Sequence, residues 1–439
     1  MPRRIDKPLT LKMPVEERFI PLAAGFVGQA ARGLGLDEEA ADEMALAAEE
    51  VVAYLSGLGV AGQELAVQCL AGSHFIETTF TLPVPHLQLR AFNMTTTVNV
   101  DDEAGLDQMG LLIASRMTDR FRVLRPTSGN LQLVLDKELR YPEIAAESPT
   151  HPAKALSRFT IQSPDAAQIK WFIRLVNGCC PSRFFPLDFH YPGKIVDMAA
   201  AGDMRILLAV GPAGEIGGGL AWQWQGTKTV ELYGPYVFHP DSHPDMARQL
   251  LETCIGDVAR TPALALICRM PTPQLPEGYL EVLDSVDGGS QDGDATTAEA
   301  QFRLMHEDTG SVVWSHPELV SFLEGEYRRL FFPRDIQPVT ADGEEQEAFS
   351  VLSVDTDRRL HQATLRPIWP GADSTANLAA HVELLRQEEI GSIFFEMDLG
   401  VSWQSGFTPG LFSLGFVPRL ILPYAGVADI VVFALAGTP

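Results

Sequence analysis

The sequence has 439 residues, with 57 acidic residues against 33 Lys and Arg, and a formal net charge of −24. This balance argues against a nucleic-acid-binding surface, because contacts with phosphate need clustered cations. Hydrophobic residues make up 46% and charged residues 21% of the chain, which is typical of globular domains. A chain of this length is expected to form about two to four domains.

The five cysteines are odd in number and include no CxxC pair. This pattern predicts reduced thiols in a cytoplasmic protein, and neither a disulfide framework nor a metal site. The first residues are basic but lack the apolar segment of a signal peptide. No run of about 20 apolar residues is present to span a membrane. We therefore expect a cytoplasmic protein without a membrane partner.

The first 145 residues alternate between helix and strand patterns. Asp37, followed by Glu38 and Glu39, predicts a helix start, because the helix dipole favours acidic residues there. Hydrophobic periodicity predicts two helices, several strands, a helix that runs into a strand, and a closing strand. The predicted segments are 10–13, 16–33, 37–58, 64–72, 74–82, 86–94, 109–124 and 131–139.

Two segments of this region carry a family resemblance. The helix LAAEEVVAY at 46–54 and the segment MGLLIASRMTDRFRVLRPTSGNLQLVLDKEL at 109–139 resemble the ATPase domain of the GHKL superfamily, closest to the serine-kinase anti-sigma factors of bacteria. The resemblance implies a two-layer α/β sandwich that binds ATP with Mg²⁺ and that often dimerises, so a homodimer is expected. It also implies a phosphate contact at Gly110 and Leu111 and a catalytic base at Glu50.

The same region departs from the family pattern in its motifs. Tyr54 stands where the family has the Asn that holds Mg²⁺, and the segment RAFNMTTT has neither the Asp nor the Gly of the box that reads adenine. Three alternatives follow. The region is a nucleotide-free module kept for structure or partner binding, a module that binds a nucleotide in a changed mode, or an active serine kinase.

A Pro- and Ala-rich linker at 142–154 precedes a second region, 155–312. Its patterns follow the order β-α-α-β-β-β-α-β, from a strand at 157–164 to a buried strand at 263–270. This order resembles the GNAT acyltransferase superfamily. The resemblance implies that the strand before the main helix separates from its neighbour, and that a loop at the helix start holds the pyrophosphate of acyl-CoA.

The resemblance places the acyl-CoA loop at 239–248, and it makes Glu215, Tyr233 and Tyr236 candidate catalytic groups near the acceptor. The cofactor-binding candidates in the loop are His239, Asp241, Ser242, His243, Met246, Ala247 and Arg248. The loop lacks the family's glycines, and it carries two Asp carboxylates where the anionic pyrophosphate would lie. The glycines of GEIGGGL at 214–220 lie between strands, which predicts a turn or a bulge rather than a phosphate loop.

The third region, 313–439, repeats part of the second. The segments 230–283 and 363–424 share the order strand, helix, strand, strand, and a Gly-, Asp- and Thr-rich insertion at 284–301 follows the first of them. The run GLFSLGFVPRL at 410–420 resembles the tail of GNAT proteins, in which a Tyr often acts as general acid. Here that position is Phe412, which has no proton to donate. The loop at 371–377 lacks the family's glycine pair as well.

Together these patterns predict an α/β fold of α+β layers. A GHKL-like two-layer sandwich at 1–145 precedes GNAT-like mixed sheets flanked by helices at 155–312 and, in part, at 313–439. The main functional prediction is a regulatory or sensory protein that acts by binding a small ligand or a protein partner. The alternatives are an acyl-CoA-dependent N-acetyltransferase and an ATP-dependent serine kinase of the anti-sigma type.

Overall fold

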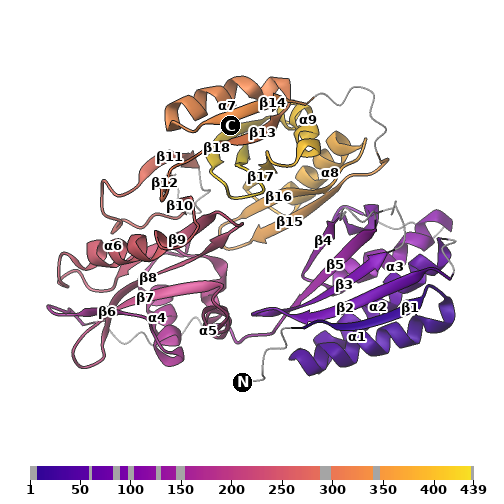
Figure 1. Ribbon diagram of the computed structural model, residues 1–439, viewed down its shortest axis with the longest axis horizontal. Coiled ribbons are helices and arrows are strands. Elements are labelled where there is room, and N and C mark those ends of the chain that lie inside the picture. The colour runs from indigo at the N-terminus through magenta and orange to yellow at the C-terminus, as the bar shows by residue number, and fades with distance from the viewer. Residues whose placement is uncertain are drawn as a thin grey trace. The chain divides into compact units, whose positions relative to one another are not determined.

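The chain folds as a mixed α/β protein with several sheets, shown in Figure 1 as a computed structural model. The structure describes residues 7–58, 62–82, 89–96, 103–124, 130–144, 154–286, 298–339 and 347–436. Most of the predicted linker at 142–154 and of the predicted insertion at 284–301 lies outside these ranges. None of the described helices is long and apolar enough to cross a lipid bilayer.

The chain divides into two compact units. Unit 1 comprises Met1–Arg140, Gln346–Ser353 and Pro367–His381. Unit 2 comprises Tyr141–Glu345, Val354–Arg366 and Val382–Pro439. The two short segments that return to unit 1 are therefore separated by long stretches of chain from the rest of it.

Unit 1 has two layers, an antiparallel sheet and the helices that pack on it (Figure 1). The strand order is β1-β2-β3-β5-β4. Helix α2 begins after Asp37, whose carboxylate accepts a hydrogen bond from the backbone N–H of Ala40 at 2.8 Å, as the sequence predicts. The elements are β1 (Leu9–Pro14), η1 (Glu17–Phe19), α1 (Ile20–Leu34), α2 (Glu38–Gly57), β2 (Glu64–Ala71), β3 (Phe75–Leu82), η2 (Arg90–Phe92), α3 (Glu103–Met117), β4 (Arg120–Leu124) and β5 (Leu131–Glu138).

Two predictions for unit 1 are wrong in detail. Over its described part, the predicted strand at 86–94 is the 3₁₀ turn η2, because Leu89, Ala91 and Phe92 all turn into the core. Helix α3 begins at Glu103 rather than at 109. The polar residues before 109 suggest a loop, but acidic side chains also suit the first turn of a helix.

Asn93 holds the returning chain against unit 1. Its amide nitrogen donates to the carbonyl oxygen of Ser350 at 2.8 Å, and its oxygen accepts from the backbone N–H of Leu352 at 3.0 Å. Asn377 donates to the same Asn93 oxygen at 3.2 Å and to the Ser350 carbonyl at 2.9 Å. The Asn93 side chain, which is buried, thus pairs with the segment at 350–352 as a neighbouring strand would.

The returning segments also complete the core of unit 1. Val351 and Trp369 belong to the same buried cluster as the residues of α1, α2 and the sheet. Gly371 makes this close approach feasible, because a Cβ there would lie 2.1 Å from the backbone nitrogen of Ser350. Only a residue without a side chain fits at that point.

Unit 2 contains a seven-stranded sheet and most of a five-stranded one. Their strand orders are β11-β12-β10-β9-β8-β7-β6 and β15-β16-β17-β19-β18. The elements that lead to the first sheet are β6 (Thr160–Gln162), α4 (Ala166–Cys179), η3 (Ser182–Phe184), η4 (Leu187–His190), α5 (Pro192–Ala201), β7 (Met204–Val210), β8 (Ile216–Gln225), β9 (Thr229–Val237), α6 (Met246–Val258), β10 (Ala265–Cys268), β11 (Glu281–Val286) and β12 (Ala298–Leu304).

The remaining elements begin with a parallel strand pair that the sequence did not predict, β13 and β14, connected through α7. Its strands are short, and β14 (RDIQP) is too polar to stand out as a strand. The elements are β13 (Ser311–Ser315), α7 (Pro317–Leu330), β14 (Arg334–Pro338), β15 (Val351–Asp357), β16 (Gln362–Trp369), α8 (Ser374–Gln387), β17 (Ser392–Asp398), η5 (Ser402–Phe407), α9 (Thr408–Ser413), β18 (Phe416–Leu422) and β19 (Ile430–Leu435).

The second and third regions share one topology, and we call them the first copy (155–312) and the second copy (313–439). The strand order β11-β12-β10-β9 in the first copy matches β18-β19-β17-β16 in the second. Within each of these sets of four strands, the strands before and after the main helix are parallel, and the other pairs are antiparallel. The shared sheet topology therefore agrees with the repeated order of strand, helix, strand and strand seen in the sequence.

The first prediction concerns Asn93. We expect Asn93→Ala to lower the free energy of unfolding of unit 1 by about 2–4 kcal/mol, because it leaves the buried Ser350 carbonyl and Leu352 N–H with fewer partners. Asn130→Ala, at an exposed position of the same unit, serves as the control and should change stability by less than about 0.5 kcal/mol. Denaturant unfolding followed by circular dichroism measures both. Equal effects of the two variants would contradict the role of Asn93.

A second prediction concerns His381, which is fully buried in unit 1. Its Nδ1 bonds to the Asn377 carbonyl oxygen at 2.8 Å, and no described residue hydrogen-bonds to its Nε2. Burial lowers the pKa of His381, so the unfolded chain takes up the proton more readily. This stability is present above the ordinary histidine pKa of about 6.5 and is lost as the pH falls below it.

We therefore expect the urea midpoint to fall between pH 7 and pH 5, and to fall less in His381→Leu than in the natural chain. Leu378→Ala, which truncates a buried apolar side chain of the same helix, is the control and should lower stability without changing the slope of this pH dependence. If His381→Leu retains the full pH dependence, other groups are responsible for it.

Candidate functional site

The parallel strands β9 and β10 of the first copy separate part of the way along β9, and we call this place the β9–β10 opening. Their pairing ends at Glu231 and Ile267, although β9 continues to Val237. A parallel pair that separates leaves the backbone groups of one strand without a neighbouring strand. The second copy has the same feature, since the pairing of β16 and β17 ends at Leu365 and Phe395 while β16 continues to Trp369.

Two side chains satisfy the edge of β9 at this opening. The Thr272 hydroxyl donates to the Pro235 carbonyl at 2.8 Å. The Gln274 amide accepts from the Val237 N–H and donates to the Val237 carbonyl, both at 3.3 Å. Thr272 is buried and Gln274 is exposed. The two hydrogen bonds to Val237 are therefore long and solvent-exposed, and such bonds are weaker than short, buried ones.

Helix α6 begins next to the end of β9, and its N-terminus lacks a side-chain cap. Its first buried residue, Met246, packs against Gly217 and Gly218 of β8. The backbone N–H groups of an uncapped first turn attract anions. Asp245 does not cap them, because its carboxylate pairs with Arg248 at 3.2 Å.

The loop before α6 is held by contacts within itself and with nearby chain. Each of its two histidines accepts a hydrogen bond from a backbone N–H of the loop. His239 Nδ1 accepts from the Asp241 N–H at 3.1 Å, and His243 Nδ1 accepts from the Asp245 N–H at 3.2 Å. The Ser242 hydroxyl accepts from the Leu156 N–H at 3.4 Å. The remaining candidates, Ala247 and Arg248, lie in the first turn of α6. Within the described ranges, no group of three or more His, Cys, Asp or Glu side chains is placed to hold a metal ion.

Four polar side chains gather where β9 and β10 separate, and we call them the β9 polar cluster: Gln223, Glu231, Tyr233 and Arg269. Arg269 donates to both carboxylate oxygens of Glu231, at 2.7 and 2.8 Å. Gln223 donates to the Tyr233 hydroxyl at 2.7 Å, and Tyr233 lies on the same strand as Glu231, close enough to feel its charge. Burial, followed by the charge of Glu231, raises the pKa of Tyr233 well above its ordinary value, so this hydroxyl keeps its proton at neutral pH.

Of the three predicted catalytic residues of the first copy, only Tyr233 lies in this cluster. The Tyr236 hydroxyl donates to the Phe184 carbonyl at 2.8 Å, and burial raises its pKa as well. Glu215 lies in the turn between β7 and β8, where its carboxylate accepts from the Ala213 N–H at 3.2 Å. Tyr236 and Glu215 therefore hydrogen-bond to backbone groups and do not join the β9 polar cluster.

Sequence reasoning missed Glu231 and Arg269. Each is the charged residue within or directly after an apolar strand, VELYG and ALIC. A charge in a strand that is buried on both faces needs a partner of opposite sign, since an unpaired buried charge is costly. That signal was available, but the sequence does not show which two strands are neighbours.

Phe412, which the sequence resemblance aligns with a general acid, is an apolar ring packed in the second copy. Phe412 lies in α9 and contacts the ring of Phe433 at a centroid distance of 6.3 Å. The glycine-poor loop at 371–377 brings Gly371 against the backbone of Ser350 within unit 1. These residues have packing roles.

In unit 1 the structure brings two predicted residues together. A Cβ at Gly110 would lie 2.6 Å from a carboxylate oxygen of Glu50, so α2 and α3 touch there. Burial, followed by the charge of Glu49, raises the pKa of Glu50. Leu111 is fully buried in the core. Nucleotide binding at this place stays a prediction.

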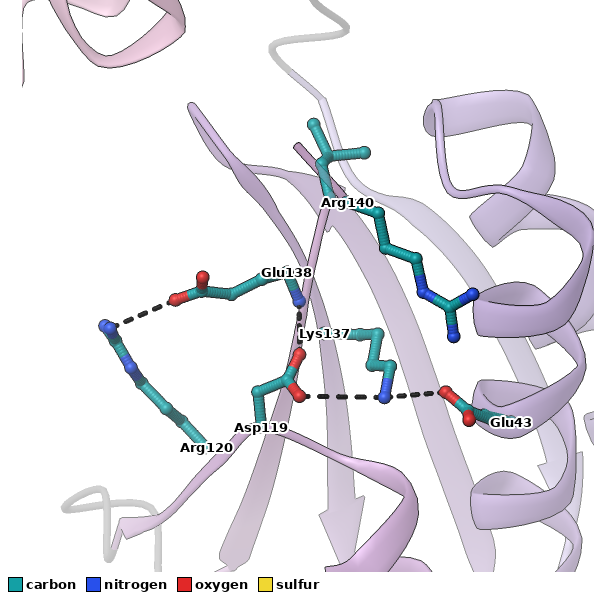
Figure 2. A pocket seen from close by; sticks show the side chains of 7 residues that line it. Glu43, Asp119, Arg120, Lys137, Glu138 and Arg140 are labelled. Atoms are coloured by element: carbon teal, nitrogen blue, oxygen red, sulfur yellow. Dashed lines mark hydrogen bonds and ion pairs between the residues drawn. The ribbon is translucent and has the colours of Figure 1, made fainter. Parts of the chain in front are cut away.

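A charged groove of about 470 Å³ lies elsewhere in unit 1. It is lined by Glu43, Asp119, Arg120, Lys137, Glu138, Leu139 and Arg140. Figure 2 shows Lys137 between Asp119 and Glu43, at 3.6 and 2.7 Å, and Arg120 beside Glu138 at 3.1 Å. These charges pair with one another across the groove. Their arrangement therefore does not by itself indicate a ligand site.

No protein-family model and no curated protein matches the sequence. The solved structures similar to about a third of the chain are GNAT acetyltransferases. A GNAT family N-acetyltransferase from Escherichia coli, solved in complex with CoA, is 16% identical over 36% of this chain and 87% of its own, with a TM-score of 0.23. An acetyltransferase of the GNAT family from Staphylococcus aureus is 10% identical over 34% of this chain and 100% of its own, with a TM-score of 0.26.

A third prediction concerns the glycines of β8, which adjoin a bulge against β9, as the sequence predicts. A Cβ at Gly218 would lie 2.6 Å from the backbone carbonyl oxygen of Tyr236. We expect Gly218→Ala to lower the free energy of unfolding by about 1–3 kcal/mol through overpacking. Gly256→Ala in α6 meets nothing within 4 Å and should raise it by about 0.5–1 kcal/mol. Thermal unfolding of both variants measures the contrast, and a neutral Gly218→Ala would show that β8 and β9 can move apart.

Proposed function

We propose that the first copy binds acyl-CoA along the free edge of β9 and transfers the acyl group to an amine. The observation that carries this proposal is the edge at Pro235 and Val237. Side chains of the segment after β10, Thr272 and Gln274, satisfy its backbone groups in place of a neighbouring strand. An extended ligand with amide groups can replace those side chains as an added strand does.

The chemistry of acyl-CoA suits this edge. Its pantetheine arm is a narrow chain with two amides, which can exchange hydrogen bonds with the Val237 N–H and carbonyl in place of Gln274. Its pyrophosphate is an anion, which the uncapped first turn of α6 can bind through backbone N–H groups. The carboxylates of Asp241 and Asp245 oppose this contact, so we expect modest affinity that improves as salt screens their repulsion.

The β9 polar cluster supplies groups for the transfer step. The amine nitrogen attacks the thioester carbonyl carbon, and the carbon–sulfur bond breaks. The amine loses one proton to Glu231, the departing thiolate takes one from Tyr233, and a proton then passes from Glu231 back to Tyr233 on the same strand. The net reaction gives an amide and free CoA.

A second candidate function is ligand or partner binding without transfer, as in a regulatory or sensory protein. Two observations favour it. Arg269 occupies both oxygens of Glu231, which leaves this carboxylate less free to accept a proton. Phe412 in the second copy cannot donate a proton at all. In this case acetyl-CoA, or a related ligand, binds and no product forms.

The fourth prediction tests the binding edge. In calorimetry with acetyl-CoA, we expect Gln274→Ala to bind about 5–10-fold more tightly than the natural chain, because two competing hydrogen bonds are removed. Gln387→Ala, on an exposed face of α8, is the matched control and should leave the affinity unchanged. The proposal fails if acetyl-CoA produces no heat with either the natural chain or Gln274→Ala.

Turnover separates the two candidates. With a panel of primary amines and release of free thiol as the measurement, Glu231→Gln should lower the rate at least about 100-fold while retaining the affinity for acetyl-CoA. A natural chain that binds acetyl-CoA but releases no thiol with any amine would support binding without transfer.

A further inference from the structure

The opening of the second copy carries an ion pair with the opposite order of charges. In the first copy the acid, Glu231, is on the strand before the helix, and the base, Arg269, directly follows the strand after it. In the second copy the base, Arg366, is on the strand before the helix and the acid, Glu396, is on the strand after it. The Nε of Arg366 donates to Glu396 at 2.6 Å.

The two ion pairs are joined within unit 2. Arg269 donates through Nη1 to Glu396 at 3.3 Å while it holds Glu231 with its other nitrogens. Arg366 continues the chain to Asp355. The order of charges from one copy to the other is therefore acid, base, acid, base, acid. If both copies had the same order of charges, like charges would meet at this junction.

Because part of this chain of charges is buried, each buried charge needs a partner of opposite sign. The carboxylate side chains of Glu231 and Glu396 are 1% and 6% exposed, whereas Asp355 at the end is 67% exposed. Burial alone raises the pKa of Glu396, but Arg366 and Arg269 lower it below its ordinary value. Glu396 is therefore ionised at neutral pH, and it fixes the Arg269 guanidinium from the side opposite to Glu231.

We infer that the second copy completes the site of the first: Glu396 is a positioning residue that, through Arg269, orients the Glu231 carboxylate at the point where β9 and β10 separate. This inference rests on the proposed acyl transfer. It gives the second copy a role that needs neither a cofactor loop nor a general acid of its own. A merely structural ion pair would affect stability without changing the rate of the chemical step.

The test combines turnover with a stability cycle on the full chain. Glu396→Gln should lower kcat about 10–100-fold at a temperature where the variant stays folded, with the dissociation constant for acetyl-CoA changed by less than about twofold. Glu396→Asp, which keeps the charge on a shorter arm, should recover part of the rate and guards against a variant that fails to fold. Asp257→Asn, in an exposed pair with Arg260, is the matched control and should leave kcat unchanged.

The stability cycle uses Glu231→Gln, Glu396→Gln and the double variant without any ligand. We expect the unfolding equilibrium constant of the double variant to be at least about fivefold larger than independent effects predict, because each single variant leaves Arg269 one carboxylate and only the double variant removes both. Independent effects would overturn the inference even if acyl transfer is observed. An unchanged kcat in Glu396→Gln would also overturn it, and would leave the proposed function standing. A natural chain without any transfer overturns both.

Discussion

The pairing of buried charges is the constraint on which unit 2 depends. Arg334 shows it most fully, since its guanidinium is completely buried between Asp308 at 2.8 Å and Asp429 at 2.7 Å. These residues come from β14, the segment before β13 and the start of β19, so one cation fixes three separate parts of the chain. Loss of one partner from such a group leaves an unpaired buried charge and costs about 3–5 kcal/mol, whereas the complete group adds little net stability. The main effect of buried ion pairs of this kind is therefore to specify which segments of the chain meet, and their contribution to net stability is small.

In unit 1, neutral side-chain amides hold distant segments of the chain together, where unit 2 uses buried charges. The amide of Asn93 takes the place of a strand edge for the segment at 350–352, and Asn377 doubles the contact from α8. Neutral amides need no counter-charge, but they need every donor and acceptor filled, which makes the fit sensitive to geometry. The aromatic contact between Arg90 and Phe349, at 4.8 Å, closes the same region. The turn that the GHKL resemblance assigns to adenine reading is thus occupied by contacts with the chain itself.

The sequence predicts what depends on local periodicity and caps. Asp37 as a helix start, the amphipathic α6 and the apolar β17 follow from residues within one turn or one strand of each other. The parallel pair β13 and β14 was missed because its strands are short and partly polar, and only tertiary contacts stabilise them. Glu231 was missed for a related reason. Its partner Arg269 is 38 residues away, and no local pattern shows which strands become neighbours.

The candidate site was predictable in its place but not in its working parts. The order of elements placed an opening between the strands that flank α6, and the register of β9 and β10 agrees with it. The residues that decide whether the opening is usable are Thr272 and Gln274, which lie in an irregular segment after β10 and have no motif. Their side chains hydrogen-bond to the edge of β9 that an acyl-CoA would need. Rotation of the exposed Gln274 side chain away from Val237 would free the backbone groups of Val237 for such a ligand. The Glu231–Arg269–Glu396 contacts rearrange less easily, since the carboxylates of Glu231 and Glu396 are buried and a change would separate them from the Arg269 guanidinium. Ligand entry should therefore move the Gln274 segment and leave the charged junction between the two copies fixed.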